Sequence, residues 1–145
     1  MLKDIISVAA IESGVEEPAA RHAVGIILNA AQRQGGDLIE RIFAQVPGAR
    51  TLSASTATRE GAPRGPIAQL IEQTPGGRQH VTFDMLFRLQ RAGLGHAEIS
   101  SLMNTLSRVL GKRFSLGETA LIAALFEGSA PAIESENPGR SSAVA

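Results

Sequence analysis

Large apolar side chains recur every three or four residues along two stretches of the chain, residues 1–48 and 81–128. This spacing places them on one face of an α-helix, whereas a half-buried strand would alternate apolar and polar residues. Glycine or proline interrupts the pattern at Gly14, Gly35 and Pro47 in the first stretch. The sequence therefore predicts an all-α helical bundle of about six helices, with three similar helices in each stretch and no β-sheet.

The expected helix boundaries follow from residues that favour helix ends. Pro18 suits the first turn of the second helix, where backbone amides have no partner. Thr82 is the expected N-cap of the fourth helix, and Ser115 opens a Ser-x-x-Glu capping box for the sixth. The expected helices cover about residues 2–11, 16–34, 37–46, 82–92, 96–110 and 115–126.

Residues 49–80 have a different composition, rich in Ser, Thr, Gly, Pro and Arg. Only residues 66–73 in this segment have the spacing of a short helix. We therefore expect a linker over residues 49–80 that contains one short helix. Residues 129–145 have few apolar side chains to bury, and we expect them to form a disordered tail.

The two three-helix stretches resemble each other, which suggests an internal repeat. With an offset of 79 residues, Ala20 of the second helix matches Ile99 of the fifth, and Ile27 matches Leu106. A unit of about 47 residues buries little apolar surface by itself. We therefore expect the second unit, residues 81–128, to pack on the first unit, residues 1–48.

The first 48 residues also resemble a known group of small helical proteins. The likeness is carried by an Ala-rich second helix followed by Gln34-Gly35-Gly36, Leu38-x-x-x-Ile42-Phe43 and Pro47-Gly48. In this order the motifs look like the YidB-like group of bacterial proteins, whose domains are of unknown function. The resemblance implies a bacterial, cytosolic, all-α protein and supplies no catalytic residues.

Residues with catalytic or metal-binding chemistry are few and do not converge. The chain has no cysteine, and His22, His80 and His96 lack the spacing that places two imidazoles on one metal ion. Nucleophile and phosphate-loop motifs are missing as well. The carboxylate pair Glu16-Glu17 lies at an expected helix start, where capping explains it. The sequence therefore predicts a protein that is not an enzyme and has no cofactor and no metal site.

Charge and hydropathy bear on the location of the protein. The 14 basic and 14 acidic side chains cancel, and no apolar stretch approaches the roughly 18 residues of a membrane span. The uncharged run over residues 5–11 is too short for a signal peptide. We expect no membrane span and a cytoplasmic location.

A helix-turn-helix offers an alternative function. The Gly14-Val15 turn between two helices matches that motif over about residues 10–24, and Arg21 and His22 would then contact DNA. However, the first unit has four basic against six acidic side chains, and DNA affinity depends on neutralising phosphates. The charge therefore disfavours nucleic acid as a partner, and DNA-binding regulation is kept only as an alternative.

The favoured function follows mainly from the absence of a convergent catalytic or ligand motif, and aromatic residues indicate where an interaction surface would lie. Four of the five phenylalanines, Phe83, Phe87, Phe114 and Phe126, lie in the second unit. Although phenylalanine is usually buried, rings beyond what the core needs would form an interaction surface for another protein or for a second copy. The predicted function is a non-enzymatic interaction or oligomerisation module. A small-ligand or enzyme site in a pocket between the repeats is a second alternative.

Overall fold

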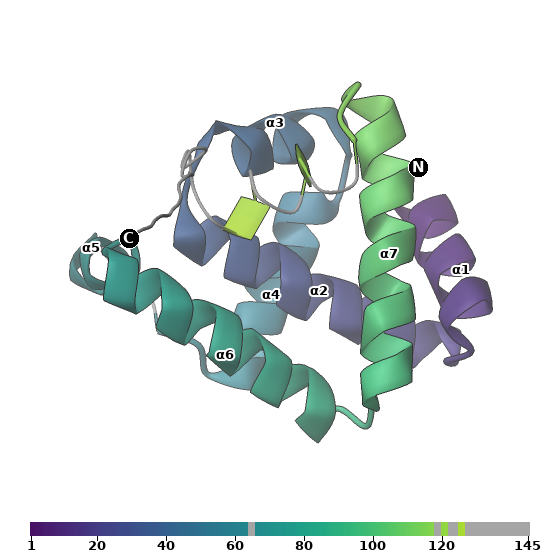
Figure 1. Ribbon diagram of the computed structural model, residues 1–145, viewed down its shortest axis with the longest axis horizontal. Coiled ribbons are helices and arrows are strands. Elements are labelled where there is room, and N and C mark those ends of the chain that lie inside the picture. Colours follow the sequence, from purple (N-terminus) through teal and green to yellow (C-terminus); the bar gives the residue numbers. More distant parts are fainter. Residues whose placement is uncertain (64–65, 118–119, 122–124, 127–145) are drawn as a thin grey trace, which may run out of the picture.

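The computed structural model describes residues 1–63, 66–117, 120–121 and 125–126. These residues form a bundle of seven named α-helices and no β-strand, which confirms the predicted all-α class (Figure 1). The helices are α1 (Leu2–Ser13), α2 (Glu17–Gln34), α3 (Asp37–Gln45), α4 (Ala49–Glu60), α5 (Pro66–Glu72), α6 (Pro75–Arg91) and α7 (His96–Arg113).

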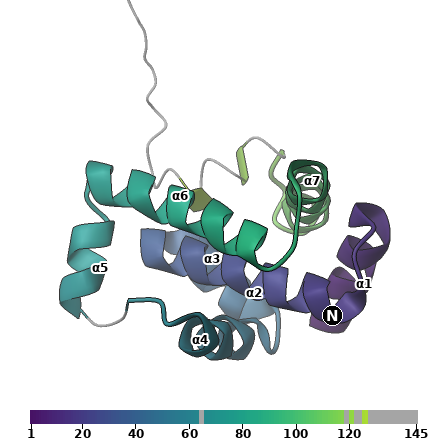
Figure 2. The same cartoon turned by 90° about the horizontal axis from the view of Figure 1, so that it is seen from below.

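Helix α2 lies at the centre of the bundle. It contacts α1, α3, α4, α5 and α6, and Figure 2 shows α4 and α6 on opposite sides of it. From Ala23 to Leu28 every residue of α2 is buried. A helix that is buried on all sides belongs to a core, so α2 is the element around which the other helices pack.

Helices α1 and α7 lie side by side at one end of the bundle (Figure 1). The Glu12 carboxylate at the end of α1 accepts hydrogen bonds from Thr105 Oγ1 at 3.0 Å and from the Arg108 guanidinium on α7. The Ser101 hydroxyl donates to the Glu12 carbonyl oxygen. Polar contacts therefore join two helices that are far apart in the sequence.

The prediction of a linker over residues 49–80 is wrong, because this segment contains α4, α5 and the start of α6. Apart from Leu52, the buried face of α4 is made of small residues, which give no apolar stripe in the sequence. At Gly25 of α2 a Cβ atom would lie 2.0 Å from Thr56 Oγ1 of α4, so only glycine permits this close approach. Ser53 of α4 donates a hydrogen bond to Gln32 Oε1 at 2.9 Å. The short helix predicted over residues 66–73 is confirmed as α5.

The start of α6 also differs from the prediction. Thr74, not Thr82, is the N-cap, and its hydroxyl oxygen accepts a hydrogen bond from the Gly77 amide at 3.1 Å. The Thr82 hydroxyl is used inside the fold instead, where it accepts a hydrogen bond from Gln34 Nε2 at 3.0 Å. Helix α6 is therefore about two turns longer than expected and reaches α5.

The core combines side chains from both halves of the sequence in one cluster, from Ile5 on α1 to Phe126. Helices α2 and α7 each contain 18 residues, and their first residues differ by the offset of the proposed repeat. A true duplication stays a prediction. Five residues of the sixth predicted helix (118–119 and 122–124, within residues 115–126) and the whole predicted tail, residues 129–145, lie outside the described residues.

Candidate functional site

A chain of charged side chains crosses the interface between α2, α4, α5 and α6. At one end, His22 Nε2 on α2 lies 2.7 Å from Glu60 Oε2 on α4. Arg88 Nη1 on α6 donates to Glu60 Oε1 at 3.2 Å and to the Glu60 carbonyl oxygen at 2.6 Å. Arg88 Nε donates to Asp84 Oδ2, one turn earlier on α6, at 2.8 Å. The same Asp84 oxygen connects this pair to Arg33 on α2.

Arg33 completes the chain. Its Nη1 donates to Asp84 Oδ2 at 2.8 Å, and its Nε lies 3.1 Å from both carboxylate oxygens of Glu72 on α5. The side chains of Arg33 and Glu72 are only 6% and 7% exposed. We call the six residues His22, Glu60, Arg88, Asp84, Arg33 and Glu72 the charge chain. Basic or imidazole groups alternate with carboxylates along it, so each buried charge has an opposite neighbour.

Pairing within the charge chain favours the ionised forms of Asp84, Glu60 and Arg33. Burial opposes ionisation of Asp84, but hydrogen bonds from Arg33 and Arg88 outweigh it and lower the Asp84 pKa. Burial likewise opposes ionisation of Glu60, yet His22 and Arg88 lower its pKa. The Arg33 pKa is raised, because Glu72 and Asp84 more than compensate for burial. Asp84, Glu60 and Arg33 are therefore charged near neutral pH and cross-link the helices.

The charge chain also fixes the rotation of α6 about its axis. Val81, Met85 and Leu89 of α6 face the core, with no more than 3% exposure. Asp84 and Arg88 are held against the neighbouring helices by the bonds described above. Residues two positions after Val81 and Met85 therefore lie on the opposite side of the helix, which is turned to solvent.

This outer side carries the two most exposed phenylalanines of the described residues. Phe83 is 62% exposed and Phe87 is 57% exposed, one helical turn apart. The Arg91 guanidinium lies 5.9 Å from the centre of the Phe87 ring. We define the α6 face as the exposed residues His80, Phe83, Phe87, Gln90 and Arg91. The face is aromatic and basic, and it contains no acidic side chain.

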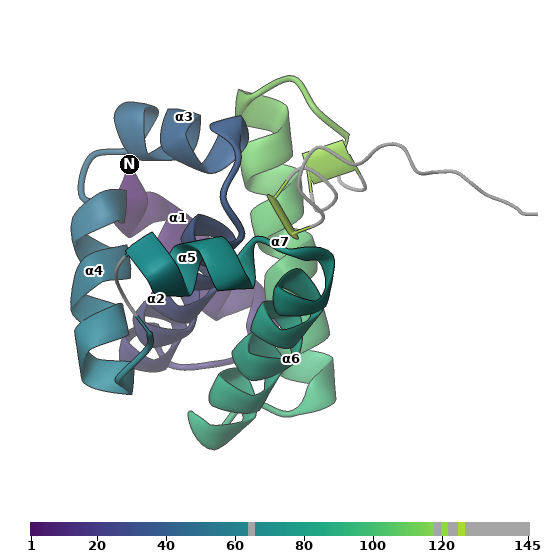
Figure 3. The ribbon, with the colours of Figure 1, turned by 90° about the vertical axis from the view of Figure 1, so that its left-hand side faces the viewer.

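Helix α5 presents a second exposed apolar stripe, made of Ile67, Leu70 and Ile71. Its only buried residue is Glu72, the partner of Arg33. Figure 3 looks onto α5 and shows it between α4 and α6. Helix α5 is therefore held to the bundle largely by an ion pair, while its apolar side chains point outward.

The other two predicted surface phenylalanines belong to the core. Phe114 is 7% exposed and Phe126 is 8% exposed, so neither contributes to an exposed surface. The Arg41 guanidinium lies over the Phe114 ring at 5.4 Å. Sequence spacing could not separate the two pairs of phenylalanines, because both occur beside core residues of helical periodicity.

Arg21 and His22, the residues expected to contact DNA, differ in their surroundings. Arg21 is exposed, but His22 is hydrogen-bonded to Glu60 within the charge chain. The helix that would enter the major groove is α2, and its middle section is buried on all sides. A recognition helix needs an exposed face, so this arrangement gives little support to the helix-turn-helix alternative.

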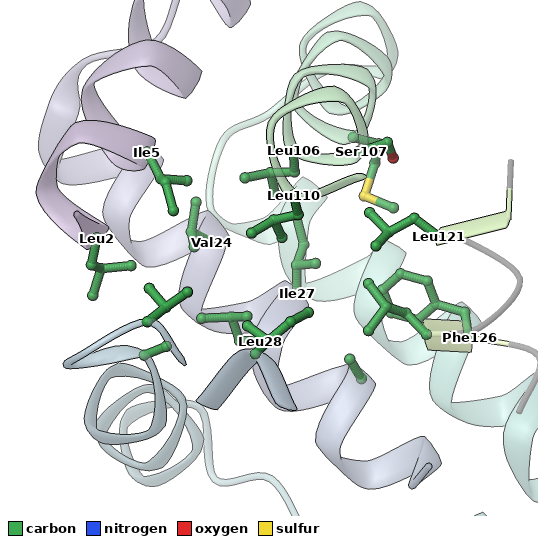
Figure 4. A pocket seen from close by; sticks show the side chains of 16 residues that line it. Leu2, Ile5, Val24, Ile27, Leu28, Leu106, Ser107, Leu110, Leu121 and Phe126 are labelled. Carbon is green, nitrogen blue, oxygen red and sulfur yellow. The ribbon is translucent and has the colours of Figure 1, made fainter. Parts of the chain in front are cut away.

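Two cavities bear on the ligand-binding alternative. An apolar cavity between α1, α2, α3 and α7 has a free volume of about 30 Å³, room for about one water molecule (Figure 4). A more polar cleft of about 210 Å³ lies beside Arg33 and is lined partly by Asn29, Gln32 and Gln69. Both are smaller than the roughly 300–1,000 Å³ of common ligand sites. Within the part of the chain that the structure describes, no group of three His, Asp or Glu side chains could hold a metal ion.

Sequence reasoning missed most of the charge chain. The contacts that join Arg33 to Glu72 and Arg88 to Glu60 span 39 and 28 residues, and such separations leave no pattern in the sequence. One local signal was available: Asp84 and Arg88 have the spacing of a helical ion pair. A second was Arg33, which follows the apolar residues Ala30 and Ala31 in the last turns of the Ala-rich helix α2.

Comparison with known proteins gives no relatives. No protein-family model matches the chain, and no significant match was found among curated proteins or solved structures. The likeness of residues 1–48 to the YidB-like group stays a prediction. In the described residues, no helix combines the length and apolar character needed to cross a membrane.

Proposed function

We propose that this protein is a non-enzymatic interaction module whose docking surface is the α6 face. The observation that carries the proposal is the outward position of Phe83 and Phe87, each more than half exposed on a helix whose rotation is fixed by buried ion pairs. Aromatic and arginine side chains are enriched at protein interfaces, and phenylalanine is among the residues most often fully buried. The α6 face has this composition.

The alternatives have weaker support. The 30 Å³ cavity is too small for a ligand, and the 210 Å³ cleft has its only charged side chain already paired with Glu72 and Asp84. The residue His22, expected to contact DNA, is bonded to Glu60. A cytoplasmic location is part of the proposal and rests on the sequence-based expectation.

Peptide selection tests the docking surface without knowledge of a natural partner. Random peptides displayed on phage are selected on the immobilised protein, and each selected peptide is then measured against the F83S/F87S variant. Serine and phenylalanine have similar helix propensities, so the variant should keep the fold. We expect the selected peptides to bind this variant at least about tenfold more weakly, because interface anchors contribute most of the affinity.

A matched control removes the exposed apolar stripe of α5 instead. The I67S/I71S variant loses a similar apolar area but leaves the α6 face intact. We expect it to bind the selected peptides as the parent does. If the selected peptides bind F83S/F87S as tightly as they bind the parent, α6 is not the docking surface.

A further inference from the structure

We propose that the partner of the α6 face is a second copy of this chain, which presents its α1 face in a head-to-tail contact. The inference rests on the proposed function and adds the identity of the partner. We define the α1 face as Asp4, Ser7 and Ile11 of α1 with Glu17 at the start of α2. Three observations lead to it: an exposed isoleucine, a concentration of acidic side chains and the composition of the α6 face.

Ile11 is the most exposed large apolar residue among those the structure describes, at 80%. Ile6, Ala9 and Ala10 of the same helix are buried, so Ile11 lies on the outer side of α1. Asp4 is two turns before Ile11 on that side and is exposed. In a contact, the Ile11 side chain would supply apolar area against which an aromatic pair can pack.

Acidic side chains gather at this end of the molecule. The Ser7 hydroxyl donates to Glu17 Oε2 at 3.2 Å, which places the Glu17 carboxylate beside α1. Glu16 is exposed next to it. Away from this corner, the exposed Glu40 is already paired with Arg50 at 2.6 Å. The α1 face therefore joins an apolar side chain to the carboxylate of Glu17, whereas the Asp4 carboxylate is paired with the N-terminal amino group at 3.7 Å.

The α6 face has the complementary composition. Phe83 and Phe87 supply apolar area, and Arg91 supplies positive charge at the end of the same stripe. The single acidic residue of α6, Asp84, is turned away and bound to Arg33 and Arg88. Arg91 of the α6 face and Glu17 of the α1 face carry opposite charges, so contact between these two faces is electrostatically favoured over contact between two copies of the same face.

The two faces lie on different sides of the molecule, since α1 is at one end and α6 crosses the front (Figures 1 and 2). A contact between different faces is heterologous, and it leaves one free α1 face and one free α6 face on every pair. Association should therefore continue into rings or chains. A two-fold dimer through α6 alone would bring the Arg91 side chains together, which the charge disfavours.

Two variants that each lack one face test the contact in the full chain. F87S/R91E disables the α6 face, and I11S/E17K disables the α1 face. Sedimentation velocity should show the parent growing in mass with concentration, with association weakened at least about tenfold by a rise from 0.05 to 0.5 M NaCl. Each variant alone should be monomeric. The two variants mixed should form a 1:1 dimer and nothing larger, because only one intact pair of faces exists.

The exposed Arg59→Glu change on α4 is the matched control and should associate like the parent. Far-UV circular dichroism confirms that each variant is folded. Persistent self-association of I11S/E17K would overturn the head-to-tail contact and indicate an α6–α6 dimer. A parent whose mass stays that of a monomer at every concentration would also overturn the head-to-tail contact. The same holds if that monomer instead binds vesicles of phosphatidylserine and phosphatidylcholine through α6. In both cases, α6-dependent peptide binding would leave the proposed function standing.

Discussion

Arg33 of α2 and Asp84 of α6 are joined by a 2.8 Å hydrogen bond between Nη1 and Oδ2, across 51 positions of sequence. The same guanidinium binds Glu72 of α5, and the same carboxylate binds Arg88. This arrangement ties the central helix to two later helices and sets which side of α6 faces solvent. Phe83 and Phe87 are thus exposed on a helix whose opposite side is held by buried Val81, Met85 and Leu89 and by the paired Asp84 and Arg88.

The first prediction concerns Arg33→Met. Methionine matches much of the arginine side chain in size but leaves the carboxylates of Glu72 and Asp84 without their common partner. Because breaking a buried ion pair strands its partners, we expect a loss of about 3–5 kcal/mol in the free energy of unfolding. Urea denaturation followed by circular dichroism measures it. Arg50→Met, which breaks the exposed pair with Glu40, should cost no more than about 1 kcal/mol. Equal losses in the two variants would contradict a structural role for the charge chain.

The second prediction concerns the contact between α2 and α4. Gly25→Ala places a Cβ atom 2.0 Å from Thr56 Oγ1 and 2.9 Å from Thr56 Cβ, so the helices must separate. Overpacking should cost about 1–3 kcal/mol, although alanine favours helix by about 1 kcal/mol over glycine. Thermal unfolding measures the change. Gly76→Ala on α6, where no atom lies within 4 Å of the new Cβ, should be neutral or slightly stabilising. A stabilised Gly25→Ala variant would rule out the close approach.

The third prediction concerns pH. The pKa of Asp84 is lowered from its ordinary value of 3.8, since Arg33 and Arg88 outweigh burial. The unfolded chain therefore binds a proton at a higher pH than the folded chain does. The stabilisation by ionised Asp84 is complete above the unfolded pKa and is lost as the pH falls through the lowered folded pKa. Urea midpoints between pH 6 and pH 3 should fall less steeply for Asp84→Asn than for the parent. Parallel curves would contradict this assignment.

The fourth prediction compares two phenylalanines. Phe87→Ala removes an exposed ring and should change the free energy of unfolding by no more than about 0.5 kcal/mol. Phe114→Ala empties a buried position and should cost about 3–5 kcal/mol. Urea denaturation of both variants measures the difference. Similar costs would mean that Phe87 is packed against other side chains, which would remove the basis for the α6 face.

The sequence predicted best the helices with apolar stripes. Helices α1, α2, α3 and α7 lie close to their expected ranges, because their buried side chains recur at helical spacing. Helix α4 was missed for a physical reason. Its buried residues include Ser53, Thr56 and Ala57, which pack by fitting closely against Gly25 and not by burying large apolar area.

The sequence predicted the aromatic residues of the candidate site but not which of them are exposed. Phe83 and Phe87 were proposed together with Phe114 and Phe126, and only the structure separates the exposed pair from the buried pair. The separation depends on the rotation of α6, which is fixed by partners on α2 and α4. Contacts between such distant positions leave no periodic signal in a single sequence.

One measurement decides whether the α6 face is an interaction surface between copies. It is sedimentation velocity of the parent protein and of the F83S/F87S variant, each over a wide range of concentrations. The account predicts a parent whose mass rises with concentration and a variant that stays monomeric at every concentration. Parent and variant with the same mass at all concentrations would contradict it.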